Sequence, residues 1–182
     1  MIHLPENSVR CTFLGALLPV FQTLPFESQT FQYEDWSMKH GLSLPNKGDY
    51  SDIHRLVELA TLAEESGWDG FFLWDHIASG IGPHVDPWIA TAAIAAHTSK
   101  IRLGLLITPL SRRRPWKVAR EIVSLDHLSG GRMVLGAGLG DFREKEFRSF
   151  GEVVDPHTRG QMLDEALEIV TGLQSGQRFS YS

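Results

Sequence analysis

Four short strand-like runs, each followed by a helical pattern, limit what this chain can fold into. The runs KHGLSL, GFFLW, IRLGLLI and RMVLGAG span residues 39–44, 70–74, 101–107 and 132–138, and the last three are nearly continuous in apolar residues. Between and after them, apolar side chains recur at helical spacing, which predicts helices over residues 51–67, 88–98, 115–128 and 157–173. Apolar strands that alternate with helices form a parallel sheet covered by helices. The sequence therefore predicts an α/β protein, either an open doubly wound sheet or a barrel of eight such units.

Capping residues support the helix boundaries. Ser51 or Asp52 can cap the first helix, and the Asp-Pro pairs at residues 86–87 and 155–156 combine a cap with a first-turn proline. The segment before the last helix, residues 139–151, is polar, and we interpret it as partly helical.

The composition is that of one globular domain of 182 residues. A formal net charge of −5 argues against a nucleic-acid partner, because phosphate binding needs a basic surface. The single cysteine, Cys11, excludes an internal disulfide framework and suits a reducing cytosol. The apolar residues 11–21 are too short to span a bilayer and lack the flanks of a signal peptide. We therefore expect a cytoplasmic protein with no membrane partner.

Residues 1–37 contain aromatic residues and prolines without a sustained period. They could form an arm that wraps the domain, but we favour an extension upstream of a natural start at Met38, because the regular pattern begins there. The predicted domains are thus a poorly defined extension over 1–37 and an α/β domain over 38–182.

Chemistry-bearing residues follow directly after the predicted strands, at residues 45–49, 75–76, 108–114 and 136–141. Parallel-sheet enzymes place their sites just past the carboxyl ends of the strands. If these four segments converge, they supply a histidine, carboxylates, arginines and a glycine-rich turn. Such a set suits a pocket for a planar, anionic cofactor that acts on a small-molecule substrate.

Each of these residues also has a plain structural interpretation. His76 could pack beside aromatic residues, but its place at a strand end favours proton transfer. Asp75 could accept a hydrogen bond from a cofactor ring, orient His76, or belong only to a turn. The run Arg112–Arg114 could be a solvated loop, or one of its members could bind an anionic group of the cofactor.

The turn GAGLGD contains Gly136, Gly138 and Gly140, with Asp141 where a dinucleotide fingerprint has its last glycine. The glycines could allow a tight strand exit or a close approach of the backbone to a flat ring. The remaining histidines show no ligand spacing, so we predict no metal site.

Several segments resemble the luciferase-like monooxygenase superfamily. They are GWDGFFLWDHI, DPWIATAAIAAHTSKIRLGLLITPL, RRRPWKVAREIVSLDHLSGGRMVLGAGLGD and LDEALEIVTGL. The resemblance implies a (β/α)8 barrel, or TIM barrel, that binds FMN or the related deazaflavin coenzyme and oxidises a small organic substrate.

The resemblance also implies the roles of single residues, by their position in the matching segments. His76 would lie beside the reactive edge of the ring and Asp75 would contact the deazaflavin. A non-prolyl cis peptide would prop the ring near Leu106 and Ile107, with Thr108 also at the cofactor. Gly136, Gly138 and Gly140 would line the cofactor, and Asp141 would be a second catalytic residue.

The chain differs from the family in length. It contains about four of the eight units of such a barrel, which typically needs around 250 residues. We therefore predict that the chain is the amino-terminal half of a luciferase-like oxidoreductase. Catalytic activity with reduced cofactor would distinguish it from a protein without turnover. The alternative is a non-catalytic half-barrel that self-assembles or binds flavin without turnover, and a doubly wound nucleotide-binding domain comes third. Because an open sheet leaves an unpaired edge, we expect a homo-oligomer.

Overall fold

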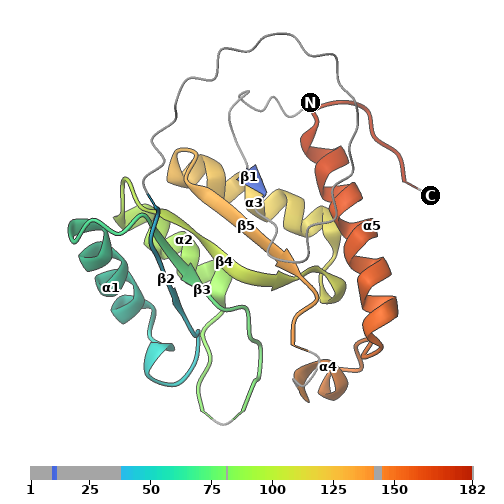
Figure 1. Ribbon diagram of the computed structural model, residues 1–182, viewed down its shortest axis with the longest axis horizontal. Helices are drawn as coiled ribbons and strands as arrows, with labels where there is room; N and C mark the ends of the chain where they lie inside the picture. The colour runs from blue at the N-terminus through green and yellow to red at the C-terminus, as the bar shows by residue number, and fades with distance from the viewer. Residues whose placement is uncertain (1–9, 12–37, 81, 142–144, 182) are drawn as a thin grey trace.

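The computed structural model, shown in Figure 1, describes residues 10–11, 38–80, 82–141 and 145–181. Its strands are β1 (Arg10–Cys11), β2 (Gly41–Leu44), β3 (Gly70–Leu73), β4 (Arg102–Pro109) and β5 (Met133–Gly138). Its helices are α1 (Ile53–Glu65), α2 (Pro87–His97), α3 (Pro115–Ser129), α4 (Lys145–Ser149) and α5 (Pro156–Gln174), with 3₁₀ turns η1 (Gly48–Tyr50) and η2 (Leu110–Arg112). The four predicted strands and four predicted helices are all present, and the polar segment contains the short helix α4.

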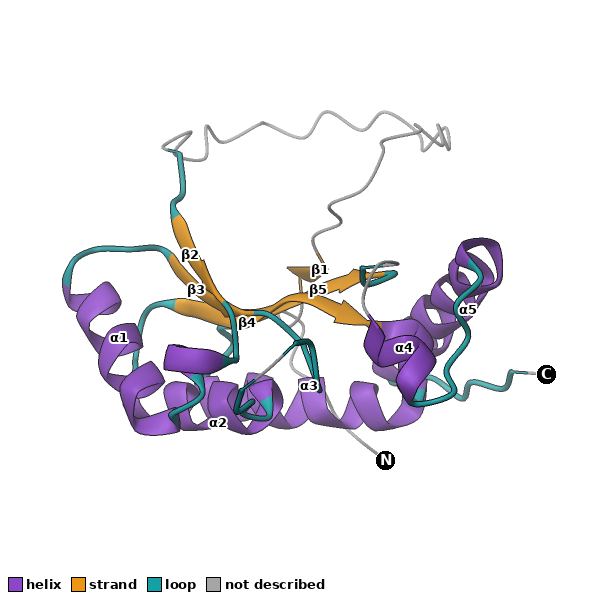
Figure 2. Cartoon of the chain, turned by 90° about the horizontal axis from the view of Figure 1, so that it is seen from below, coloured by secondary structure: helices purple, strands orange, loops and turns teal. Residues whose placement is uncertain are grey.

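The strands form one parallel sheet in the order β1-β5-β4-β3-β2. From β2 to β5, each strand therefore pairs with the next one along the chain. A doubly wound sheet reverses its strand order at a switch point and carries helices on both faces, whereas a barrel adds strands one after another and carries its helices outside. Here α1, α2 and α3 lie on the same face of the sheet (Figure 2). The strand order and the position of these helices on one face of the sheet therefore indicate barrel units and exclude the doubly wound alternative.

The short strand β1 was not predicted. It pairs with β5 through Arg10 opposite Val134 and Cys11 opposite Leu135. Apart from these two residues, the extension, the arm and most of the apolar residues 11–21 lie outside the described part of the chain.

The core lies between the sheet and the covering helices. Its fully buried side chains alternate along the strands, as the two-residue period of a strand requires. They include Phe71 and Leu73 of β3, Leu103 and Leu105 of β4, and Leu135 of β5, which pack against Leu56 of α1, Ile94 of α2 and Ile122 of α3.

Three aspartates cap the helices at their amino-terminal ends. Asp52 accepts from the N–H of His54, Asp86 from those of Trp88 and Ile89, and Asp155 from that of Thr158. The two Asp-Pro predictions are confirmed, and Asp52 rather than Ser51 is the cap of α1.

Two charged side chains fasten the end of the sheet where the strands begin. Glu64 of α1 accepts hydrogen bonds from three consecutive backbone N–H groups, those of residues 99–101, at 2.6–3.1 Å. Arg132, which is buried, donates to four backbone carbonyls and to the Thr98 hydroxyl at 2.6–2.9 Å. Two of those carbonyls belong to Ala95 and Thr98 at the end of α2, so Arg132 satisfies groups that a helix end leaves without partners. Arg132 in the sequence SGGR therefore has a structural role.

Within the described residues, no helix combines the length and the apolar character needed to cross a bilayer.

Candidate active site

A pocket of about 180 Å³ opens where the strands end. Its lining brings together Asp75 and His76 after β3, Leu106 and Ile107 of β4, and Gly140 and Asp141 after β5. The prediction that Asp75, His76 and Asp141 share one end of the sheet is therefore confirmed. The peptide bond between Leu106 and Ile107 is cis, as the resemblance implied.

Three other predicted cofactor residues lie outside this lining. Thr108 is fully buried. A Cβ atom on Gly136 would come within 2.5 Å of the Leu105 carbonyl oxygen, and one on Gly138 within 2.7 Å of Ile107 Cδ1. Close packing of β4 against β5 thus accounts for Gly136, whereas the Ile107 side chain beside Gly138 could shift. Contact of Thr108 and of both glycines with a cofactor stays a prediction.

Asp75 is paired with two arginines of the segment after β4. Its carboxylate, which is fully buried, lies 2.7 Å from Arg113 Nη2 and 3.1 Å from Arg112 Nη2, and Arg112 also donates to the Asp75 backbone carbonyl. Arg113 lies over the ring of Trp88, 5.4 Å from its centre. Arg112 and Arg113 therefore neutralise Asp75 inside the protein. Binding of an anionic cofactor group by a member of the Arg112–Arg114 run stays a prediction.

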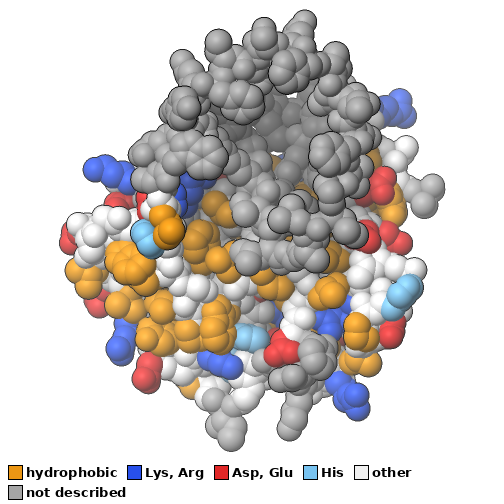
Figure 3. Space-filling model, in the orientation of Figure 1, with side chains coloured by type: hydrophobic (Ala, Val, Ile, Leu, Met, Phe, Trp, Pro, Cys, Tyr) orange, Lys and Arg blue, Asp and Glu red, His pale blue; other side chains and the backbone are white. Residues whose placement is uncertain are grey.

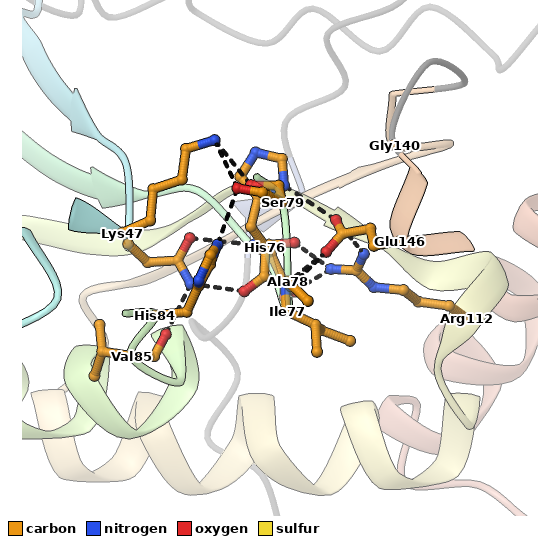
Figure 4. A network of polar contacts seen from close by, with 12 residues as sticks. Lys47, His76, Ile77, Ala78, Ser79, His84, Val85, Arg112, Gly140 and Glu146 are labelled. Atoms are coloured by element: carbon orange, nitrogen blue, oxygen red, sulfur yellow. Dashed lines mark hydrogen bonds and ion pairs between the residues drawn. The ribbon is translucent and has the colours of Figure 1, made fainter. Parts of the chain in front are cut away.

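Glu146 of α4 is the site residue that the sequence reasoning missed. Its buried carboxylate accepts from four donors: His76 Nδ1 at 3.0 Å, Arg112 Nη1 at 2.9 Å, and the backbone N–H groups of Ile77 at 2.8 Å and Ala78 at 2.9 Å (Figure 4). Burial alone would raise the pKa of Glu146, but these hydrogen bonds more than offset it and lower the pKa to about 2. The polar segment was recognised as partly helical, yet nothing in its sequence says which of its carboxylates turns toward β3.

His76 is held from two sides. Its ring contacts Glu146, and its backbone N–H donates to the side-chain oxygen of Asn46 at 3.2 Å. The ring also meets the edge of Trp74, with centres 5.7 Å apart and planes inclined by 71°. The His76 side chain keeps 16% of its surface exposed, so it is fixed and still accessible from the pocket.

Asn46, fully buried after β2, closes the loop that carries His76. Its amide nitrogen donates to the carbonyls of His76 and Val85, both at 2.7 Å, so it ties together the two ends of the loop. Lys47 adds a bond to the Ser79 hydroxyl at 2.8 Å (Figure 4). The sequence had marked residues 45–49 as a strand end at the site but gave Asn46 no role.

Asp141 lies at the mouth of the pocket, close to a buried cation. Arg159 of α5, 1% exposed, donates to the Gly140 carbonyl at 3.1 Å and lies 3.9 Å from the centre of the Phe147 ring. Burial lowers the pKa of Arg159 and the charge of Arg112 lowers it further, while the charge of Asp141 acts in the opposite direction. Asp141 itself is exposed, and its catalytic role stays a prediction.

Among the described residues, no group of three or more histidine, cysteine, aspartate or glutamate side chains is placed to hold a metal ion.

The sequence is similar to oxidoreductases of known activity. Residues 37–182 match the family described as luciferase-like monooxygenase. Limonene 1,2-monooxygenase from Rhodococcus erythropolis is 34% identical over 125 residues, covering 69% of this chain and 32% of the relative. An F420-dependent glucose-6-phosphate dehydrogenase from Microbacterium testaceum is 32% identical over 134 residues, covering 70% of this chain and 39% of the relative. The chain thus spans well under half of the length of these relatives.

Solved structures show the same fold. A monooxygenase from Streptomyces bottropensis superimposes with a TM-score of 0.69 at 27% identity, over 80% of this chain and 45% of that one. An F420-dependent secondary alcohol dehydrogenase, solved with an F420-acetone adduct, gives a TM-score of 0.70 at 23% identity, over 79% of this chain and 44% of that one. Since the family match extends over most of its residues, the chain belongs to the luciferase-like monooxygenase family.

Proposed function

We propose that this chain forms the part of a flavin- or deazaflavin-dependent oxidoreductase that faces the reactive ring, in an enzyme acting on a small organic substrate. One observation carries the proposal: His76 after β3, the Leu106–Ile107 segment of β4 and Asp141 after β5 line a single pocket. Relatives of both branches support it, because the named enzymes include a monooxygenase and an F420-dependent dehydrogenase.

The pocket fits the ring part of such a cofactor. Its apolar lining includes Trp74, Leu106, Ile107 and Phe147, which suits the faces of a flat heterocycle. Leu106 and Ile107 would support the ring, and His76 and Asp141 would hold or move the proton. The cofactor, when bound, supplies the electron transfer, and the protein supplies position and proton handling.

Among the described residues that line the pocket, no cationic group is left for the cofactor's anionic tail. Arg112 and Arg113 are already engaged by Asp75 and Glu146. The tail would therefore be bound by other parts of the protein, and the ring alone would contact the described pocket.

Binding and turnover together test this proposal. The chain is titrated with FMN and, separately, with the deazaflavin coenzyme, following cofactor fluorescence, and the reduced cofactors are then assayed for turnover. Ile107→Arg should abolish binding, because it places a charge against the ring. Ile89→Arg, at an exposed position of α2 outside the pocket, should leave binding unchanged. If neither cofactor binds, or if Ile107→Arg binds as the unmodified chain does, the proposal is wrong.

A non-catalytic half-barrel that associates with itself is the second candidate. It is favoured by the outer edge of β2, which pairs only with β3 among the described strands, and by an apolar groove of about 240 Å³ beside it. Binding of flavin without turnover would select this candidate. For either candidate we propose a cytoplasmic domain over residues 38–182 that follows an extension over residues 1–37 and binds no nucleic acid.

A further inference from the structure

The carboxylate of Glu146 faces only donors. Its Oε2 accepts from the backbone N–H groups of Ile77 and Ala78, and its Oε1 accepts from Arg112 and lies 3.0 Å from His76 Nδ1. The side chain is 2% exposed. Each oxygen is thus held by two partners, so the carboxylate cannot turn without losing hydrogen bonds from a buried charge, which is costly.

The ionisation of Glu146 decides which way the bond to His76 runs. Its pKa of about 2 leaves the carboxylate ionised at neutral pH, with no proton to donate. An ionised carboxylate only accepts hydrogen bonds. The proton between the two side chains therefore belongs to Nδ1 of His76.

The other ring nitrogen follows from this. A neutral imidazole carries one N–H, so a proton on Nδ1 leaves Nε2 with a free lone pair. Within the described residues, Nε2 of His76 has no hydrogen-bond partner, and the ring lines the pocket. We propose that Glu146 is a positioning residue that holds His76 in the Nδ1–H tautomer, so that Nε2 faces the pocket as a proton acceptor.

The use of this nitrogen in a reaction rests on the proposed function, but the tautomer does not. In the neutral Nδ1–H form His76 would take a proton from a bound substrate or cofactor, whereas the Nε2–H form would give one. Glu146 thereby sets the direction in which His76 can first move a proton. Because Arg112 binds both Glu146 and Asp75, the buried Asp75 supports the same arrangement from one step further away.

The tautomer can be read directly from the ¹⁵N chemical shifts of the His76 ring in the full labelled chain, with His76→Gln identifying the signals. The measurement is made near pH 9, well above the ordinary imidazole pKa of about 6.5, so that the tautomers of the neutral ring are compared. We expect Nδ1 at the position of a protonated nitrogen and Nε2 at that of an unprotonated one. The reverse pattern in the unmodified chain overturns the proposal without any variant.

Two substitutions test whether Glu146 is the cause. In Glu146→Ala, we expect the proton to move from Nδ1 to Nε2, because no carboxylate then accepts a hydrogen bond from Nδ1. In Glu146→Gln, the amide oxygen should accept from the backbone N–H groups of Ile77 and Ala78. The amide NH₂ then faces His76 and donates to Nδ1, which becomes an acceptor. Glu64→Gln is the matched control, because Glu64 also accepts backbone N–H groups but at the other end of the sheet. It should leave the His76 signals unchanged.

A His76 tautomer that is the same in the unmodified chain and in every folded Glu146 variant refutes the positioning role. If Glu146→Ala does not fold, Glu146→Gln and the unmodified chain still decide. None of these spectra requires a cofactor. A failure of FMN and deazaflavin to bind would therefore refute the proposed function and leave the tautomer assignment unchanged. A different His76 tautomer would refute the assignment and leave the proposed function unchanged.

Discussion

At the scale of single residues, two glutamates at opposite ends of the sheet accept hydrogen bonds from consecutive backbone N–H groups. Glu64 gathers backbone N–H groups where the strands begin, and Glu146 does so where they end. Only Glu146 also contacts a histidine and an arginine. The same arrangement, a carboxylate accepting from consecutive N–H groups, therefore anchors a turn in one place and holds His76 at the pocket in the other.

Glu146 should make the stability of the protein sensitive to acid. Its pKa is lowered from 4.5 to about 2 in the folded protein, so its contribution is fully present above about pH 4.5 and is lost as the pH falls toward 2. This shift corresponds to a contribution on the order of 3 kcal/mol. Urea unfolding at pH 6 and pH 3 should show a smaller loss of stability on acidification in Glu146→Gln than in the unmodified protein. Glu58→Gln, at an exposed position of α1, should keep the original loss, and an equal loss in all three proteins would contradict the prediction.

His76→Ala should lower turnover more than cofactor affinity in a catalytically active form of the protein. Proton transfer by a positioned side chain contributes about 10²–10⁴-fold to the rate, whereas His76 gives the ring only part of its contact surface. Steady-state kinetics and cofactor titration measure the two effects separately. His97→Ala, on the exposed face of α2, serves as control. Unchanged turnover in His76→Ala would reassign His76 to packing.

At the scale of elements, the end of the sheet opposite the pocket is fastened by Arg132. Its five hydrogen bonds join the end of α2, the turn before β4 and the end of α3. These bonds hold together Ile101 and Ser129, which precede β4 and β5, and the pocket residues Leu106, Ile107 and Gly140 lie toward the other ends of the same two strands.

Arg132→Lys should destabilise the protein by about 2 kcal/mol or more. Lysine has three donors on one nitrogen, so it leaves buried carbonyls without partners, at about 1–3 kcal/mol each. Arg102→Lys, at the exposed start of β4, should change the free energy of unfolding little. Equal stability of the two variants, measured by urea unfolding, would show that the Arg132 hydrogen bonds do not contribute.

The elements could be predicted from sequence because their signals are local. Apolar runs, helical periodicity and the caps Asp86 and Asp155 each lie within a few residues of what they determine. The contacts of the site are not local: His76 and Glu146 are separated by 70 residues, and Asn46 reaches Val85 across 39. The position of His76 could be inferred from the strand end, whereas its partners depend on how α4 and the end of β2 dock.

At the scale of the whole molecule, β2 lies at one edge of the sheet, and among the described strands only β3 pairs with it. The apolar groove beside it is formed by β2 and α1, with Leu42, Leu59, Leu62 and Trp68 in its lining. Hydrophobic side chains gather on this side of the visible face (Figure 3), where Figure 1 shows α1 and β2. Unpaired edges and apolar patches both favour association.

The chain should therefore associate at micromolar concentration. Sedimentation should give a mass above that of the monomer that increases with concentration. Leu62→Glu, at a position of the groove that is 58% exposed, should weaken association, and Leu128→Glu, on α3 and 52% exposed, should not. A compact monomer that unfolds cooperatively at this concentration would contradict the expectation.

We expect a flavin or deazaflavin ring to lie against the carboxyl ends of β3, β4 and β5. Backbone ¹H–¹⁵N spectra of the labelled chain, recorded during titration with each cofactor, test it most directly. We predict shifts at His76, Ile107 and Gly140 with one cofactor at least, and none at Gly131 and Arg132, at the other end of the sheet. Shifts confined to that other end, or no shifts with either cofactor at saturating concentration, would contradict the claim.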